Sequence, residues 1–310
     1  MGPAAARIGP DSPTADSLAA MGVCDVVRAS CAAIAGGARH VEIDLDRLDR
    51  VQPGPEPELS PERHYLEGTA EEVALFTLTL DAINFGSGWF PTLRKRPGLS
   101  GYNSIATALT ERCREQGPWA PEELAALDAG AVADVLGQDP EHELMVLYAR
   151  ALNELGGFMG ERAALAVVAA SEGSAELLAE QLVEGMPLFD DPGFYKRAQI
   201  VASDLALARV AEFDDLDRLT IFADNLVPHV LRVDGVLRYE PQLAARIDAE
   251  QLLEPGEAER EIRACAVHAC ELIAAELDVP ARVLDNWLWN RGQEPRYKAR
   301  PRHRTRTTAY

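Results

Sequence analysis

Apolar residues recur at helical spacing along most of the chain. Thr69 with Glu72 forms a capping-box pattern, which opens one helix that runs on to Ile83. Pro121 and Pro140 suit the first turns of two more helices. Further helices are predicted over residues 22–37, 101–117, 159–172, 174–185, 194–210, 256–277 and 280–290. The pattern therefore predicts a protein built mainly from packed helices.

Proline and glycine interrupt this pattern. The Pro-rich stretch 52–63 predicts a loop, and "NFGSGWFP" (84–91) predicts the end of the preceding helix. Short extended pieces are predicted near 40–45 and 235–240. We therefore expect a mainly α fold, a single compact multi-helical domain over residues 21–310 with short extended segments. Residues 1–20 are expected to form a separate N-terminal segment that can be disordered.

One charge interrupts an otherwise apolar stretch. "IFADNLVPHVLR" (221–232) predicts a helix that buries Ile221, Phe222 and Val227, with Asp224 among them. Burying a lone carboxylate costs several kcal/mol unless a partner or a ligand compensates. Asp224 is therefore the first candidate for a functional residue.

The formal net charge is −20, and it is unevenly distributed. Residues 291–310 carry about +6, so the rest of the chain is strongly acidic. An acidic body repels a phosphate backbone, so we expect no direct nucleic-acid partner. The basic tail either folds back on the acidic surface or grips a phosphate or polyanion, and a solvated or self-paired charge run is the commoner outcome.

Other features concern the compartment. No apolar run reaches the length of a membrane span, and the N-terminus lacks the apolar core of a secretory signal. The five cysteines, an odd number, are typical of reduced thiols. We expect a cytoplasmic protein without a membrane partner.

Few short motifs point to a cofactor. "CAVHAC" (265–270) puts Cys265 and His268 on one helical face, but small residues packing between helices explain this stretch better than a metal does. "FGSG" is glycine-rich but follows a helix, unlike a phosphate-binding loop that follows a strand. Neither a metal nor an organic cofactor is predicted.

Two helices carry polar residues with open interpretations. Lys196 lies at the start of an apolar helix, where a cation opposes the helix dipole, so it is either solvated or paired with an anion. Asp285 and Trp289 lie four apart on one helical face, which suits either a clamp for a cationic planar ligand or ordinary helix packing.

Eight segments, taken together and in order, resemble the queuosine salvage protein family. The resemblance runs from about residue 20 to the last residue, and it is specific because all eight segments are in register. The segments are "LDAINFGSGW" (80–89), "SGYNSI" (100–105), "FYKRAQIVASD" (194–204), "IFADNLVP" (221–228), "DGVLRY" (234–239), "EREIRACAVHACE" (259–271), "LDNWLW" (284–289) and "PRHRTRTTAY" (301–310).

The resemblance implies a mainly α-helical enzyme akin to helix-hairpin-helix DNA glycosylases. It implies release of the base queuine from queuosine 5'-monophosphate, for reinsertion into tRNA, without a metal or organic cofactor. The family's catalytic aspartate falls on Asp224, and its base-contacting aspartate falls on Asp285, with Trp289 beside it. The other substrate contacts that it implies are His40, Asn84, Phe85, Lys196, Phe222, Asn290, Arg304 and Tyr310.

This chemistry would explain a buried acid at Asp224. Cleaving an N-glycosidic bond builds positive charge on the ribose. A carboxylate in a dry pocket stabilises that charge, or it forms a covalent ribosyl intermediate. A positive charge on Lys196 would keep Asp224 ionised. Lys196, Arg304 and Arg306 compete for the 5'-phosphate.

The leaving base sets a second requirement. Queuine is a 7-deazaguanine, so it lacks the N7 that many purine-cleaving enzymes protonate. Asp285 is a candidate partner for the pyrimidine edge of this base, or for the ammonium on its side arm.

The chain departs from the family pattern on the base side. Asn225-Leu226 stand where relatives have Tyr-Arg, and Asn290 stands where relatives have Asp. A related 7-deazapurine nucleotide or nucleoside is therefore an alternative substrate. Two alternatives of another class are a helical protein that binds such a nucleotide without cleaving it and a scaffold without a ligand. A scaffold predicts no pocket around Asp224.

Overall fold

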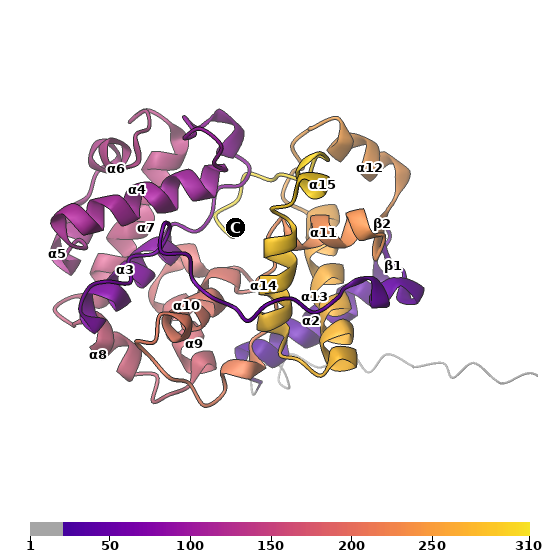
Figure 1. Cartoon of the computed structure of the whole chain (residues 1–310), viewed down its shortest axis with the longest axis horizontal. Helices are drawn as coiled ribbons and strands as arrows, with labels where there is room; N and C mark the ends of the chain where they lie inside the picture. Colours follow the sequence, from indigo (N-terminus) through magenta and orange to yellow (C-terminus); the bar gives the residue numbers. More distant parts are fainter. Residues whose placement is uncertain (1–20) are drawn as a thin grey trace, which may run out of the picture.

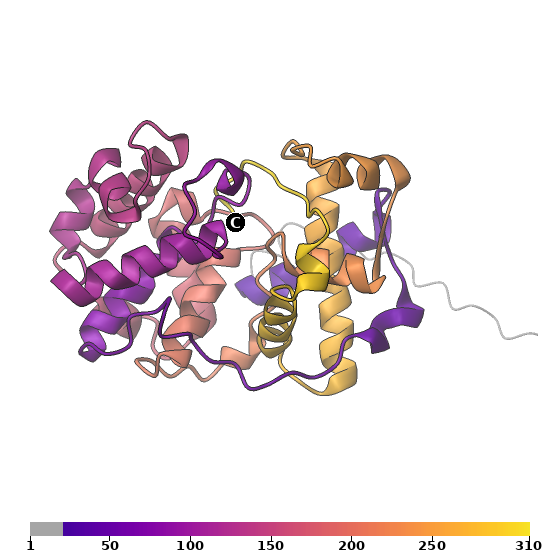
Figure 2. The same ribbon diagram turned by 45° about the horizontal axis from the view of Figure 1, so that its top comes forward.

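The computed structural model describes residues 21–310. It is mainly helical, as the apolar spacing predicts, and Figures 1 and 2 show two groups of helices lying side by side. The expectation of disorder in residues 1–20 lies outside the described residues, and the likeness to helix-hairpin-helix glycosylases stays a prediction.

The helices and strands have the following bounds. The helices are α2 (Val23–Gly37), α3 (Ala70–Ala82), α4 (Gly101–Gln116), α5 (Pro121–Ala126), α6 (Ala129–Leu136), α7 (Glu143–Met159), α8 (Ala164–Ala169), α9 (Ala175–Gly185), α10 (Lys196–Leu207), α11 (Val227–Asp234), α12 (Pro241–Asp248), α13 (Glu257–Leu277), α14 (Ala281–Arg291) and α15 (Pro295–Lys298). Short 3-10 helices span Leu45–Arg50, Phe90–Thr92, Pro187–Phe189 and Leu216–Arg218. The strands are β1 (Val41–Ile43) and β2 (Leu237–Tyr239).

Several local features of the fold match those predicted from the sequence. Thr69 caps α3 with the reciprocal capping box, since its side chain accepts from the Glu72 N–H and the Glu72 carboxylate accepts from the Thr69 N–H. Pro121 occupies the first turn of α5. The two predicted extended pieces pair antiparallel, with Val41 opposite Tyr239. The Pro-rich stretch 52–63 is a loop without regular strand or helix.

Three predicted helices differ from the structure. Pro140 lies outside α7, because the helix begins at Glu143 with His142 as its N-cap. The predicted helix over 159–172 is reduced to α8, since α7 ends at Met159 and Gly160 follows in a positive-φ conformation. The helix predicted over 221–232 begins only at Val227, so Asp224 lies in the segment before it.

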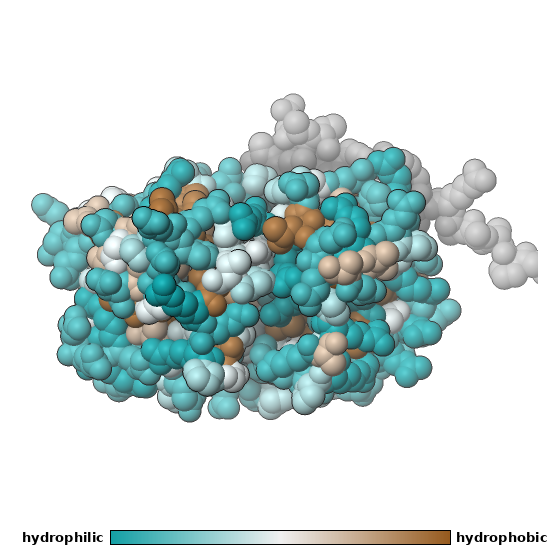
Figure 3. All heavy atoms as spheres, turned by 90° about the horizontal axis from the view of Figure 1, so that it is seen from above, coloured by the Kyte–Doolittle hydropathy of each residue, from teal (hydrophilic) through white to brown (hydrophobic). Residues whose placement is uncertain are grey.

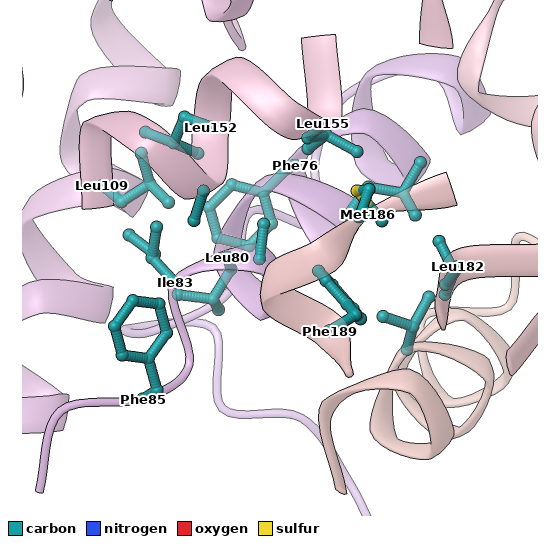
Figure 4. Packing of buried hydrophobic residues seen from close by; sticks show 14 of the residues in the cluster. Phe76, Leu80, Ile83, Phe85, Leu109, Leu152, Leu155, Leu182, Met186 and Phe189 are labelled. Carbon is teal, nitrogen blue, oxygen red and sulfur yellow. The ribbon is translucent and has the colours of Figure 1, made fainter. Parts of the chain in front are cut away.

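Two hydrophobic clusters make up the core. The first is built mainly on α3 to α10, and Figure 4 shows how side chains of several of these helices interlock around Phe76 and Leu80. The second is built mainly on α2, α11, α13 and α14, with the two strands at its edge. All five cysteines are unpaired and buried, as expected for reduced thiols.

The last residues of the chain contact both helix groups. In Figures 1 and 2 the end marked C lies between them. The Gly86 N–H donates to a Tyr310 oxygen at 2.9 Å, and the Leu253 N–H donates to the Arg304 carbonyl at 2.9 Å. Gly88 lies against this tail, because a Cβ there would lie 2.4 Å from the Thr305 oxygen. Residues 300–310 therefore join the two clusters.

The visible surface is mostly polar. Figure 3 shows hydrophilic residues covering most of one face, with small scattered apolar areas. Within residues 21–310, no helix combines the length and the apolar character that crossing a bilayer would need.

Two adjacent glycines of α7 offer a test of the packing between α5 and α7. A Cβ at Gly156 would lie 2.4 Å from the Ala125 nitrogen and 2.5 Å from the Pro121 oxygen, whereas a Cβ at Gly157 would meet nothing within 4 Å. We expect Gly156→Ala to lower the free energy of unfolding by about 1–3 kcal/mol through overpacking.

Gly157→Ala is the matched control. It should raise the free energy of unfolding by about 0.5–1 kcal/mol, because alanine loses less backbone entropy in a helix. Urea denaturation of both variants measures the difference. Equal effects of the two substitutions would contradict this close packing of α5 on α7.

Candidate active site

A pocket of about 280 Å³ lies where the two helix groups meet. Its lining comes from residues 57–64, 84–90 and 222–226, from one face each of α10 and α14, and from the tail 297–310. The loop 52–63 is held against α14, because the Trp287 ring N–H donates to the Pro55 carbonyl at 2.7 Å. Segments distant in sequence therefore enclose one cavity.

Asp224 is fixed at the start of α11. One oxygen, Oδ1, accepts the backbone N–H groups of Leu226 at 2.7 Å and Val227 at 3.0 Å. These two N–H groups lie at the N-terminal end of α11 and hold the carboxylate in place. The side chain is half-buried and lines the pocket. Its orientation is therefore set by backbone groups before any ligand binds.

Lys196 lies close to Asp224 in the same pocket. Its side chain is buried, and its Nζ donates to the Asn84 carbonyl at 3.0 Å. Burial lowers the pKa of Lys196, while the negative charges of Asp224 and then Asp81 oppose that shift. Carboxylates therefore surround Lys196, but within residues 21–310 its ammonium forms no ion pair with any of them.

Asp285 approaches from α14. Its Oδ1 accepts the Phe222 backbone N–H at 2.9 Å. Burial, and then the nearby charge of Asp224, raise the pKa of Asp285 well above its usual range. Asp285 is buried whereas Asp224 is half-buried, so these two acids have different environments, which is the arrangement that separates acid and base roles in enzymes.

Trp289 and two amides continue the α14 face of the pocket. The Trp289 ring stands edge-on to Tyr102 with 6.2 Å between ring centroids. Asn290 donates from Nδ2 to the Asn286 Oδ1 at 2.9 Å. An aromatic wall beside paired amides suits a flat, polar ligand such as a nucleobase.

Side chains of three helices hold the segment before Asp224, at Thr220, Phe222 and Ala223. Thr220 exchanges hydrogen bonds with Gln199 of α10, with its N–H 2.9 Å from the glutamine Oε1. Phe222 is held by Asp285 of α14, as described above. The Ala223 carbonyl accepts from the Arg263 Nε of α13 at 2.9 Å.

Arg263 is in turn buried in a bidentate pair with Asp191. The two nitrogen–oxygen distances are 2.9 and 2.5 Å, and both side chains are buried. Asp191 also accepts the Lys196 backbone N–H at 3.3 Å. This pair therefore connects the residue before Asp224 to the first residue of α10.

Most of the residues expected from the sequence line this pocket, although their roles stay predictions. These residues are Asn84, Phe85, Lys196, Phe222, Asp224, Asp285, Trp289, Asn290 and Tyr310. The fold brings residues of α10, α14 and the tail together in this pocket. Spacing along the sequence does not reveal such tertiary proximity.

His40 and Arg304 lie outside the pocket lining, and their expected substrate contacts stay predictions. The His40 N–H donates to the Glu261 carboxylate at 2.6 Å, and its ring lies 3.9 Å from Glu257. The Arg304 guanidinium donates to the Glu250 backbone carbonyl at 3.2 Å. Both residues therefore have acidic neighbours outside the pocket lining.

The sequence analysis did not single out several other pocket residues, among them Tyr102, Asp204, Arg302 and His64. Tyr102, Asp204 and Arg302 lie within the quoted segments "SGYNSI", "FYKRAQIVASD" and "PRHRTRTTAY", which were the available signal. His64 lies in the loop before α3 and carried no signal. Arg306, proposed for the phosphate, instead pairs with Glu143 at 3.2 Å.

The basic tail therefore has two parts. Arg304 and Arg306 fold back on acidic neighbours, as a self-paired charge run would, whereas Arg300 and Arg302 line the pocket. Within residues 21–310, no three histidine, cysteine, aspartate or glutamate side chains converge as metal ligands.

Comparisons with known proteins agree on one family. The profile of the family described as "Queuosine salvage protein" matches residues 63–310. A queuosine 5'-phosphate N-glycosylase/hydrolase of Sphaerobacter thermophilus is 35% identical over 280 residues, which cover 82% of this chain and 86% of the relative. The protein of the same name from Bos taurus is 28% identical, over 91% of this chain and 98% of its own. The one from Mus musculus is 32% identical over 52% of this chain and 56% of its own.

The region matched by the profile includes Lys196, Asp224 and Asp285, which the fold brings into one pocket. The chain belongs to the queuosine salvage protein family.

Proposed function

We propose that this protein hydrolyses the N-glycosidic bond of queuosine 5'-monophosphate and so releases queuine. The observation that carries the proposal is Asp224, a half-buried carboxylate fixed by two backbone N–H groups inside a nucleotide-sized pocket. The named activity of the relatives supports the substrate.

Asp224 has the chemistry that this reaction needs. As the bond from C1' to the base breaks, its electron pair leaves with the base and the ribose becomes cationic. A carboxylate already oriented toward that carbon stabilises the cation without reorganising, which lowers the barrier. Water then adds to C1', and the products are ribose 5-phosphate and the free base.

Asp285 is placed to act on the base. Burial raises the pKa of Asp285 well above its usual range, which favours the protonated carboxyl. It can therefore donate a hydrogen bond to the electron-rich departing base as well as accept one from its pyrimidine edge. This role suits a 7-deazaguanine, which offers no N7 for protonation.

Arg302 is the side chain that we assign to the 5'-phosphate. It lines the pocket, and its guanidinium makes no hydrogen bond or ion pair in the described part of the chain. Burial lowers the pKa of Arg302, and the Asp224 charge opposes that shift, so the two groups are close. A phosphate on the ribose that Asp224 faces would complete the pairing of this arginine.

The first prediction concerns Asp224. We expect Asp224→Asn to lower kcat by about 10³-fold, the size seen when one central electrostatic group is removed. The assay detects free queuine by mass spectrometry after incubation with queuosine 5'-monophosphate. Asp248→Asn, an exposed acid paired with Arg232, is the control and should keep full activity. Undiminished release by Asp224→Asn would exclude the mechanism, and no release by the wild type would exclude the substrate.

The second prediction concerns Arg302. Arg302→Gln should raise KM for queuosine 5'-monophosphate about 10- to 100-fold, because a hydrogen bond between charged groups is lost. It should leave the slower cleavage of queuosine itself unchanged. Arg304→Gln is the matched control, since its partner is Glu250. A parallel loss on nucleotide and nucleoside would refute the phosphate assignment.

The third prediction concerns the proton on Asp285. Because its pKa is raised on folding, the folded protein holds one more proton than the unfolded chain above about pH 4, and stability falls as pH rises in that window. Asp285→Asn removes this fall. As pH rises, the free energy of unfolding of the variant should increase relative to that of the wild type, by at most about 1.4 kcal/mol per pH unit.

Urea denaturation of both proteins at a series of pH values from about 4 to about 8 measures this difference in the free energy of unfolding. A constant difference between variant and wild type across that range would mean that Asp285 is ionised in the folded protein.

A further inference from the structure

Asp204 is a buried carboxyl that the proposed mechanism does not use. It is 8% exposed and lines the pocket from α10. Its side chain forms no hydrogen bond or ion pair with any described residue. Burying such a group without a partner is costly, so its retention in a ligand pocket points to a partner that the ligand supplies.

Asp81 stands behind Asp204. It is fully buried, and one oxygen accepts from the Asn84 side chain at 3.3 Å while the other has no partner. Burial raises the pKa of Asp81 to about 7, with Lys196 opposing the shift. Burial, and then the Asp81 charge, raise the pKa of Asp204 well above its usual range. The two acids therefore form a buried site that is short of positive charge, and a cation bound there would favour their ionised forms.

The position of Asp204 relates it to the base rather than to the ribose. Lys196, Ile200, Ser203 and Asp204 line the pocket along one face of α10. Eight residues separate the first from the last, which corresponds to about 12 Å along the helix axis. Lys196 marks the Asp224 end, where the proposed function places the glycosidic bond. A base bound there, with a substituent pointing away from the ribose, extends toward Asp204.

The walls near this end suit an organic cation. Tyr102 is close enough to Asp204 and Asp81 for their charges to act on its phenol. Its ring packs edge to face against the Trp289 ring. Aromatic faces and carboxylates together are the usual surroundings of a bound alkylammonium.

We propose that Asp204, backed by Asp81, forms a cation subsite that binds the aliphatic ammonium carried by the 7-substituent of a 7-deazaguanine base. This inference rests on the proposed function, because it needs the glycosidic bond to lie beside Asp224. It assigns to Asp204 the selection of amine-bearing bases over the bare 7-deazaguanine, and it assigns the bond cleavage to other residues.

The test compares two substrates that differ only in the arm. Queuosine 5'-monophosphate carries the ammonium, and 7-deazaguanosine 5'-monophosphate does not. Asp204→Asn should lower kcat/KM for the first about 10- to 100-fold, as expected when a hydrogen bond to a charged group is lost. It should change kcat/KM for the second less than twofold. Asp190→Asn, an exposed acid shortly before α10, is the charge-matched control and should alter neither value.

The other outcomes overturn the subsite. Equal losses on both substrates would assign Asp204 to the common chemistry or to the fold, and no loss on either would leave it without a ligand. Asp204→Ser, checked by thermal melting, is a second variant in case the asparagine disturbs folding, and it should show the same selective loss.

Failure of the proposed function would be distinguishable. If the wild type cleaved neither nucleotide, calorimetric binding of the free bases queuine and 7-deazaguanine would still test the subsite. Queuine should bind the wild type about 10-fold or more tightly than it binds Asp204→Asn. Equal binding of queuine to both proteins would refute the cation subsite whatever the reaction.

Discussion

The buried pair of Arg263 and Asp191 is the constraint on which the site depends. Two nitrogen–oxygen contacts fix the guanidinium, which leaves its Nε aimed at the Ala223 carbonyl, one residue before Asp224. The Asp191 carboxylate also accepts the backbone N–H of Lys196, the first residue of α10. A charged pair of this kind adds little net stability, but removing one partner leaves an uncompensated buried charge. Its value here is positional, because it sets the cation and the carboxylate of the pocket relative to each other.

The same region carries backbone strain. Tyr195, which precedes Lys196, has a φ of 49°, a left-handed conformation that bulky residues rarely adopt. Such strain persists only where the surroundings over-determine the conformation, and it is concentrated at functional sites. The Asp191 contacts to residues 194–196 provide that over-determination.

Much of the fold was readable from the sequence because it depends on local chemistry. The capping box of α3, the helix α13 and the two short strands follow from spacing and end signals within a few residues. The missed features depend on tertiary contacts. The segment before Asp224 has helical apolar spacing, yet it is extended, because Ile221 and Ala223 pack in one hydrophobic cluster while Phe222 packs in the other. No periodicity can reveal that a chain passes between two cores.

The candidate site divides in the same way. Resemblance to a family placed Asp224, Lys196 and Asp285 among the expected residues, and the fold brings them into one cavity. His40 was also expected from the resemblance, and it lies outside the pocket lining with its backbone N–H bonded to Glu261 of α13. Asp204 was overlooked because a carboxylate in the third turn of an amphipathic helix is usually a solvated residue, and its burial is known only from the structure.

The extended segment between the two clusters has a consequence for how this protein can evolve. Alternate side chains of residues 221–223 belong to different cores, so repacking either core moves the backbone that carries Asp224. Substitutions that an ordinary core would absorb by small shifts are here transmitted to the pocket. Mutational tolerance should therefore be lower in both cores than their distance from the pocket suggests, and compensating changes should arise in pairs, one in each core.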